Sequence, residues 1–310
     1  MTKAKRGIYA AAVSPFNADG SLNTDLLIGY CEHLLTDGGC DGVAPTGTTG
    51  EGTSVPMRDR LALPAAFAEA GVATDAVIFG TGAPSAEDCV ALTKAAVDAG
   101  YVNVLVLPPY YYKNPSDDGL FNYYANLVEK IGSDALRIYL YHFPQMSSVP
   151  LSTDLVLRLR KEFGGVIAGL KDSSGDFEQS RAFIEATGGV SEDFDVYPSS
   201  EAMLWDGLSI GSAGIISGST NAFANGVQAA KAAPDGPERD AAMEAVKAAR
   251  SVAAKYPMMA AMKQIEAWRS GNDTWTRMAP PLTPLSADVA AALRADLEAL
   301  GAMAASETAA

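Results

Sequence analysis

Residues 102–144, VNVLVLPPYYYKNPSDDGLFNYYANLVEKIGSDALRIYLYHFP, hold one complete strand–helix–strand unit, and this unit decides the fold. The runs VNVLVLPP (102–109) and LRIYLYHFP (136–144) are short, continuous and apolar, which is typical of strands buried on both faces. Between them, residues 116–132 show the spacing of apolar side chains that indicates a helix. Because tight hairpins join only antiparallel strands, a helix between two strands predicts that the strands run parallel.

The same alternation recurs along the chain. Further apolar runs predict strands at 7–13, 41–47, 76–82, 165–172, 195–200 and 213–219. Helical patterns lie between strands at 24–37, 85–100 and 152–164. The first of these helices opens with Thr24 as a candidate N-cap. Eight β-then-α units predict an α/β fold of the (β/α)8 TIM barrel type over residues 1–225. The alternative is a doubly wound sheet, which prefers a phosphate-type glycine turn after the first strand; VSPFNADG (13–20) does not fit GxGxxG.

After about residue 225 the strand pattern stops. Ala-rich helical patterns occupy 238–270 and 286–302, and the Pro-rich segment MAPPLTPLS (278–286) lies between them. The sequence therefore predicts a C-terminal helical extension over residues 226–310, with a frayed ASETAA tail (305–310).

The composition narrows the class of protein. The 310 residues carry a net charge of −14, and such an acidic surface repels phosphate backbones, so no nucleic acid is expected as a partner. No apolar stretch approaches the ~18 residues of a membrane span, and Ser14-Pro15 ends the only signal-like run early. Three cysteines without a CxxC motif, and two scattered histidines, predict a cytoplasmic protein without a metal site or cofactor.

Candidate catalytic residues follow from the ends of the predicted strands, because barrel active sites lie at the carboxyl ends of the strands. The run 165–172 ends in GLKD, which places Lys171 at the barrel mouth. A lysine among apolar neighbours can attack a carbonyl and form a Schiff base. An ordinary exposed lysine that begins a loop is the alternative. The adjacent Asp172 is expected to cap a helix or orient the loop backbone rather than to act as a base.

The run 136–144 ends in YLYHFP, and strand alternation sends Tyr139 and Tyr141 to one face and Leu140 and His142 to the other. Tyr141 could shuttle protons for a reactive lysine one strand away. A tyrosine packed with its hydroxyl satisfied is the alternative. His142 is expected to be structural.

Two loops complete the set of candidates. PTGTTGEGTS (45–54) has the glycines and threonines of a turn whose free N–H groups can face an anion, and a carboxylate fits better than a triphosphate. A plain Gly-rich turn is the alternative. PPYYYKNP (108–115) places three adjacent tyrosines at the mouth, where they could enter the site, pack on another subunit or simply cover the barrel.

These segments, together with VSPFNADGSLN (13–23) and GIISGSTN (214–221), resemble the dihydrodipicolinate synthase / N-acetylneuraminate lyase family of class I Schiff-base aldolases over nearly the whole chain. The resemblance implies that Lys171 forms an imine with pyruvate or another 2-oxo acid, and that Tyr141 is the general acid/base. The remaining roles that it implies are substrate-carboxylate binding by Gly47, Thr48 and Thr49, a proton relay between Thr48 and Tyr111 of a neighbouring subunit, and a pocket wall at Ile216. It also implies a homotetramer.

Departures from the family pattern bear on the second substrate. Met146 stands where synthases carry an arginine for the carboxylate of that substrate, and His142 replaces the usual asparagine. The loop 108–115 is one residue longer than the common form. Ser173 and Glu201 occupy positions where the lyase side of the family reads sugar hydroxyls, although Glu201 could simply begin a helix.

The expected activity is aldol cleavage or formation of a 2-oxo-4-hydroxy acid, such as a 2-keto-3-deoxy sugar acid, from pyruvate and an aldehyde. The alternatives are 4-hydroxy-tetrahydrodipicolinate (dihydrodipicolinate) synthase, which condenses pyruvate with aspartate semialdehyde, an imine-dependent dehydratase, and a non-catalytic barrel that binds 2-oxo acids.

Overall fold

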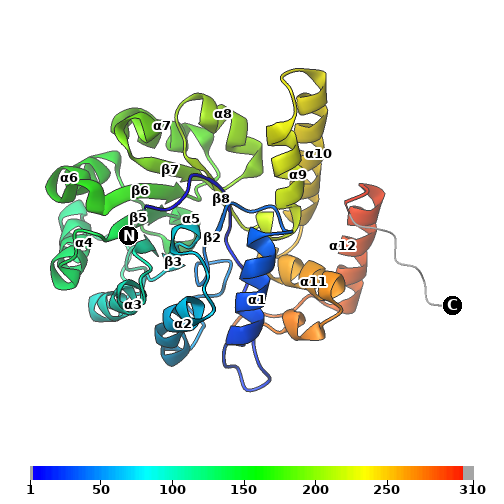
Figure 1. Ribbon diagram of the computed structural model, residues 1–310, viewed down its shortest axis with the longest axis horizontal. Coiled ribbons are helices and arrows are strands. Elements are labelled where there is room, and N and C mark those ends of the chain that lie inside the picture. The colour runs from blue at the N-terminus through cyan, green and yellow to red at the C-terminus, as the bar shows by residue number, and fades with distance from the viewer. Residues whose placement is uncertain (1–2, 303–310) are drawn as a thin grey trace.

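Eight parallel strands form the barrel of the computed structural model, which describes residues 3–302 (Figure 1). All the predicted strands are present, although each is shorter than its apolar run. They are β1 Gly7–Ala10, β2 Gly42–Val43, β3 Phe79–Gly80, β4 Asn103–Val106, β5 Arg137–His142, β6 Ile167–Asp172, β7 Asp195–Pro198 and β8 Gly214–Ser217.

Hydrogen bonds close the ring of strands. The pairings run in the orders β2-β1-β8 and β3-β4-β5-β6-β7. The amide of Ile78 donates to Val43 O (3.0 Å) and joins β2 to the segment of β3. The amide of Ala213 donates to Val196 O (2.9 Å) and joins β8 to β7. The predicted (β/α)8 barrel is therefore confirmed.

A ring of helices covers the outside of the barrel (Figure 1). The helices are α1 Thr24–Leu35, α2 Met57–Glu69, α3 Ala86–Asp98, α4 Asp117–Ile131, α6 Thr153–Phe163, α7 Phe177–Thr187, α8 Leu204–Ser209 and α9 Thr220–Ala232, with the single-turn α5 Pro144–Ser147 following β5. The predicted cap Thr24 is wrong by one residue: Asn23 accepts from the amide of Leu26, which leaves Thr24 as the first residue of α1.

The C-terminal extension consists of α10 Pro237–Ala253, α11 Met258–Ser270 and α12 Ala287–Ala299, on the side of the barrel that carries α1 and α9 (Figure 1). The predicted helical stretch 238–270 is divided near Pro257, because proline has no N–H to continue a helix. The predicted division at residue 225 falls inside α9, which runs on unbroken to Ala232. The segment 305–310 lies outside the described residues.

Three tyrosines fill the amino-terminal end of the barrel. The ring of Tyr197 contacts those of Tyr9 and Tyr139, with centroids 5.8 and 6.0 Å apart. The Tyr9 and Tyr197 hydroxyls both donate to Lys5 O, at 2.8 and 3.2 Å. Burial raises the pKa of all three phenols. The chain before β1 and these rings therefore fill the interior of the barrel at this end.

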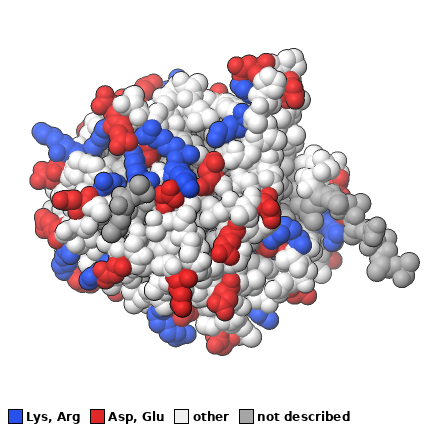
Figure 2. Space-filling model, in the orientation of Figure 1, with Lys and Arg blue, Asp and Glu red and all other residues white. Residues whose placement is uncertain are grey.

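Acidic and basic side chains intermingle on the face seen in Figure 2. Lys3 and Arg6 reach the buried carboxylate of Asp195 at 3.1 and 2.8 Å, and both also pair with the exposed Asp193. Within the described part of the chain, no helix has the length and apolar character needed to cross a membrane.

Candidate active site

Lys171 and Tyr141 lie side by side at the carboxyl ends of β6 and β5. They are register partners across these strands, and Lys171 Nζ lies 4.6 Å from the centroid of the Tyr141 ring. Both residues are buried, with relative exposures of 3% and 4%. In residues 3–302 no carboxylate forms an ion pair with Lys171, so the amine faces an aromatic ring instead of a counter-charge.

A register shift brings the two side chains to the same face. Ile138 pairs with Ile167, but Tyr139 pairs with Gly169, which leaves Ala168 as an extra residue in β6. Without this shift Lys171 would pair with His142, on the outer face of the barrel. Gly169 permits the arrangement, because a Cβ there would lie 2.2 Å from Asp195 O and 2.8 Å from the Tyr139 ring.

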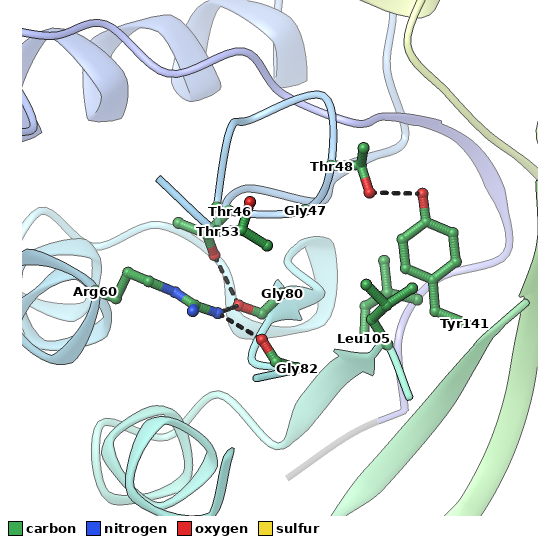
Figure 3. A pocket seen from close by; sticks show the side chains of 11 residues that line it. Thr46, Gly47, Thr48, Thr53, Arg60, Gly80, Gly82, Leu105 and Tyr141 are labelled. Atoms are coloured by element: carbon green, nitrogen blue, oxygen red, sulfur yellow. Dashed lines mark hydrogen bonds between the residues drawn. The ribbon is translucent and has the colours of Figure 1, made fainter. Parts of the chain in front are cut away.

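The Tyr141 hydroxyl donates to Thr48 Oγ1 at 3.3 Å, and the two side chains point toward each other across the pocket in Figure 3. Thr48 belongs to the turn that follows β2. This turn is closed by the amides of Glu51 and Gly52, which donate to Thr48 O and Gly47 O at 3.0 Å each. Gly52 is required, because a Cβ there would lie 1.9 Å from Thr46 O.

The amides of Thr48 and Thr49 stay free. Among the described residues neither backbone N–H donates to a protein acceptor. Free N–H groups in a tight turn favour an anion, so the turn can receive a carboxylate. Thr49 also borders β8, since its Oγ1 would lie 3.2 Å from a Cβ placed on Gly218. Ile216 of β8 is fully buried and belongs to the apolar cluster of the barrel interior that contains Tyr141.

Arg60 was not among the sequence candidates, yet it lines the same pocket as Thr48 and Leu105. Its Nη2 donates to Gly80 O and Gly82 O at 2.9 and 3.2 Å (Figure 3), and its buried Nε has no partner among the described residues. Burial lowers the pKa of this guanidinium. No motif marks this arginine in the sequence, because its position depends on how α2 packs beside β3.

His142 and Asp172 face outward, as strand alternation predicts. His142 Nδ1 accepts from the Leu151 amide (3.0 Å), and its ring contacts Phe183 edge-on at 5.3 Å. Burial lowers the pKa of His142. Asp172 accepts from the Ser174 amide (2.9 Å) and the Ser180 hydroxyl (2.6 Å). Both residues organise loops, so their expected structural roles are confirmed.

Ser173 and Glu201 differ from each other in burial and in hydrogen-bond partners. Ser173 is half-buried directly after β6, and its amide donates to His142 O at 2.8 Å. Glu201 is fully buried and accepts from Ser219 Oγ at 2.7 and 2.9 Å and from Arg250 Nη1 at 3.3 Å. Its carboxylate is therefore held by protein donors, one of which comes from α10.

Tyr111 and Met146 are exposed at the barrel mouth. Tyr111 is 74% exposed and its ring contacts that of Tyr112, with centroids 5.3 Å apart. Within one chain the structure does not bring Tyr111 to Thr48. Met146 of α5 is 54% exposed. Among residues 3–302, no group of three or more His, Cys, Asp or Glu side chains is arranged to hold a metal ion.

The sequence also matches a known protein family. The dihydrodipicolinate synthetase family matches residues 4–300. A protein of Chloroflexus aurantiacus described as an uncharacterized DapA-like lyase is 35% identical over 296 residues, which cover 94% of this chain and 96% of that protein.

Two solved structures share the fold. Dihydrodipicolinate synthase from Agrobacterium tumefaciens str. C58 is 33% identical, with a TM-score of 0.85 over 96% of this chain and 99% of that one. YagE, a prophage protein from E. coli K12 belonging to the dihydrodipicolinic acid synthase family and solved in complex with pyruvate, is 25% identical, with the same TM-score and the same coverage.

Proposed function

The chain belongs to the dihydrodipicolinate synthetase family and is a lyase of that family, and from this premise we propose that it cleaves or forms a 2-oxo-4-hydroxy acid through an imine on Lys171. A 2-keto-3-deoxy sugar acid is the proposed substrate class. The contact of Lys171 with Tyr141, whose hydroxyl reaches Thr48, is the observation that carries the proposal.

The chemistry follows from these three side chains. The Lys171 amine adds to the C2 carbonyl of the substrate, and loss of water gives the imine. In the cleavage direction Tyr141 removes the proton of the C4 hydroxyl, the C3–C4 bond breaks, and its electron pair passes into the protonated imine. The aldehyde leaves, C3 takes up a proton, and water hydrolyses the imine to release pyruvate and the free amine.

The substrate carboxylate is proposed to bind at the turn of Gly47, Thr48 and Thr49. The free amides of Thr48 and Thr49 supply two donors for it. Ile216 supplies an apolar wall in the barrel interior. A carboxylate bound there fixes the distance between C2 and Lys171, and such fixing lowers the barrier by removing freedom of motion before the reaction. The pyruvate bound to YagE supports this choice of 2-oxo acid.

The identity of the aldehyde is proposed from Met146. An exposed thioether cannot pair with a carboxylate, so aspartate semialdehyde is disfavoured even though the Agrobacterium relative is a dihydrodipicolinate synthase. Ser173, at the end of β6, is the better placed of the two proposed hydroxyl-binding residues. Glu201 could meet a polyol only by giving up donors that it already has.

Assembly is proposed to complete the site. Tyr111 is too exposed to serve its own chain, which fits a tyrosine that enters the site of a neighbouring subunit and extends the relay from Tyr141 and Thr48. The exposure of Tyr111 requires at least one neighbouring subunit for this role, and we propose the homotetramer that the family resemblance implies. Cys31, Cys40 and Cys89 are free buried thiols whose pKa burial raises, and a reducing compartment such as the cytoplasm suits them.

The test is reductive trapping. The protein is incubated with pyruvate and borohydride, digested and weighed by mass spectrometry. The expected result is a three-carbon adduct on the peptide that carries Lys171, absent from the Lys171→Ala variant. No adduct, or the same adduct in the variant, would overturn the proposal. A panel of aldehydes offered with pyruvate then identifies the second substrate. A 2-oxo-4-hydroxy acid that loses water without C–C cleavage would identify the enzyme as a dehydratase.

A further inference from the structure

A fully buried ion pair joins the C-terminal extension to the GTTGE turn. Lys263 of α11 and Glu51 are both inaccessible to solvent, and Lys263 Nζ lies 2.6 Å from Glu51 Oε1. The second carboxylate oxygen, Oε2, accepts from the amide of Ala279 at 2.8 Å. Lys263 Nζ also lies 4.7 Å from the centroid of the Phe16 ring. The extension therefore occupies both oxygens of Glu51.

Glu51 has an unusual backbone conformation within the turn. Its backbone is left-handed, with a φ of 52°, a conformation that a non-glycine residue adopts only when its surroundings hold it there. Its amide donates to Thr48 O (3.0 Å), and its carbonyl accepts from the Val55 amide (3.1 Å), just before α2. The backbone of Glu51 is therefore joined to that of Thr48 by a direct hydrogen bond.

Burying the pair of Glu51 and Lys263 costs free energy of folding. Two buried charges lose their hydration, and apolar side chains of similar volume would often stabilise the fold as well. Such charges fix one geometry, because each loses its counter-charge if the partner moves. Burial lowers the pKa of Lys263, and Glu51 opposes that effect.

We propose that Glu51 and Lys263 are positioning residues, through which the C-terminal extension sets the conformation of the turn 47–51 that receives the substrate carboxylate. The role in carboxylate binding rests on the proposed function. The positioning of the turn does not, so the two can be tested separately.

Two variants break the pair, and one serves as a matched control. Lys263→Met leaves the Glu51 carboxylate without its cation, and Glu51→Gln keeps the size of the side chain but removes its charge. The control is Lys255→Met, which removes an exposed lysine of the extension that pairs with Asp296 at 3.1 Å. Circular dichroism identifies the folded variants, and Glu51→Gln is the substitute should Lys263→Met fail to fold.

The first readout is amide hydrogen exchange of the peptide spanning 46–55, which requires no substrate. We expect exchange there to accelerate about tenfold or more in Lys263→Met and Glu51→Gln, and to stay within about twofold in Lys255→Met. The second is the pyruvate concentration that gives half-maximal borohydride trapping. It should rise about tenfold, while trapping at saturating pyruvate changes much less, because the turn binds the carboxylate and Lys171 itself is intact.

Unchanged exchange in a folded variant overturns the proposal, and so does a faster exchange that Lys255→Met shares equally. Faster exchange with an unchanged half-saturating concentration overturns the link to the carboxylate. If the unaltered protein forms no pyruvate adduct, the proposed function fails, and hydrogen exchange alone decides whether the pair positions the turn.

Discussion

Lys171 Nζ lies 4.6 Å from the centroid of the Tyr141 ring, and the hydroxyl of that ring donates to Thr48 Oγ1 at 3.3 Å. A buried amine, a phenol and a threonine hydroxyl thus form one line from β6 through β5 to the turn after β2. The first three predictions change one member of this line at a time.

Lys171→Met removes the amine and keeps an unbranched side chain of similar length. The buried lysine has no counter-charge within residues 3–302, so we expect the variant to be inactive yet more stable, by about 1 kcal/mol in the free energy of unfolding. Urea denaturation and an aldol-cleavage assay measure the two effects. A clear loss of stability would show that Lys171 also supports the fold.

Tyr141→Phe keeps the ring beside Lys171 and removes the hydroxyl. We expect kcat to fall about 10²- to 10⁴-fold, the range for loss of a general acid/base. Borohydride trapping should still label Lys171, because the amine is untouched. A variant with full kcat would show that protons move by another route.

Thr48→Val removes the partner of the Tyr141 hydroxyl without changing the shape of the side chain. We expect a smaller drop in kcat, about tenfold, since one neutral hydrogen bond is lost. Combined with Tyr141→Phe, it should add almost nothing, because both changes interrupt the same contact. Steady-state kinetics of the two single variants and the double variant give the coupling directly. Fully additive losses would contradict a shared role.

His142→Asn tests the pH dependence of stability. Burial lowers the pKa of His142, so below the unfolded value of about 6.5 the folded chain binds fewer protons than the unfolded chain. The melting temperature of the wild-type protein should therefore hold above pH 6.5, fall as the pH drops below it, and level off under the folded pKa. The melting temperature of the His142→Asn variant should fall less steeply between about pH 6.5 and about pH 5. Parallel curves would remove His142 from the explanation.

Met146→Arg tests the choice of aldehyde. A guanidinium at this exposed position of α5 supplies the missing partner for a second carboxylate. We expect kcat/KM with pyruvate and aspartate semialdehyde to rise at least about tenfold, and Met146→Leu to have no effect. A coupled assay with both substrates measures it. Efficient turnover of aspartate semialdehyde by the wild-type enzyme would favour the synthase alternative.

The barrel and the pair at its centre were predictable from local patterns. Short apolar runs between helices predict parallel strands, and the residues that end those runs include Lys171 and Tyr141. Alternation within β5 also separates Tyr141 from His142 correctly. The extra residue at Ala168 was not predictable, because register is a property of two strands together and an apolar run looks the same in either register.

Long-range ion pairs were equally hidden. Lys263 and Glu51 are 212 positions apart, and Arg250 and Glu201 are 49 apart. In the sequence Lys263 and Arg250 resemble any cation on an Ala-rich helix. Only the packing of α10 and α11 against the barrel reveals that these two cations contact buried carboxylates. The expectation that Glu201 binds substrate therefore could not take Arg250 into account.

The cluster of Tyr9, Tyr139 and Tyr197 side chains has a consequence for the order of events in the proposed reaction. Because these three side chains fill the interior at the amino-terminal end, the proposed substrate and its products would enter and leave at the carboxyl ends of the strands. If Lys171 holds the 2-oxo acid as an imine, as proposed, the aldehyde departs first and the 2-oxo acid follows once water has hydrolysed the imine. In the synthetic direction the proposed mechanism then requires pyruvate to bind before the aldehyde.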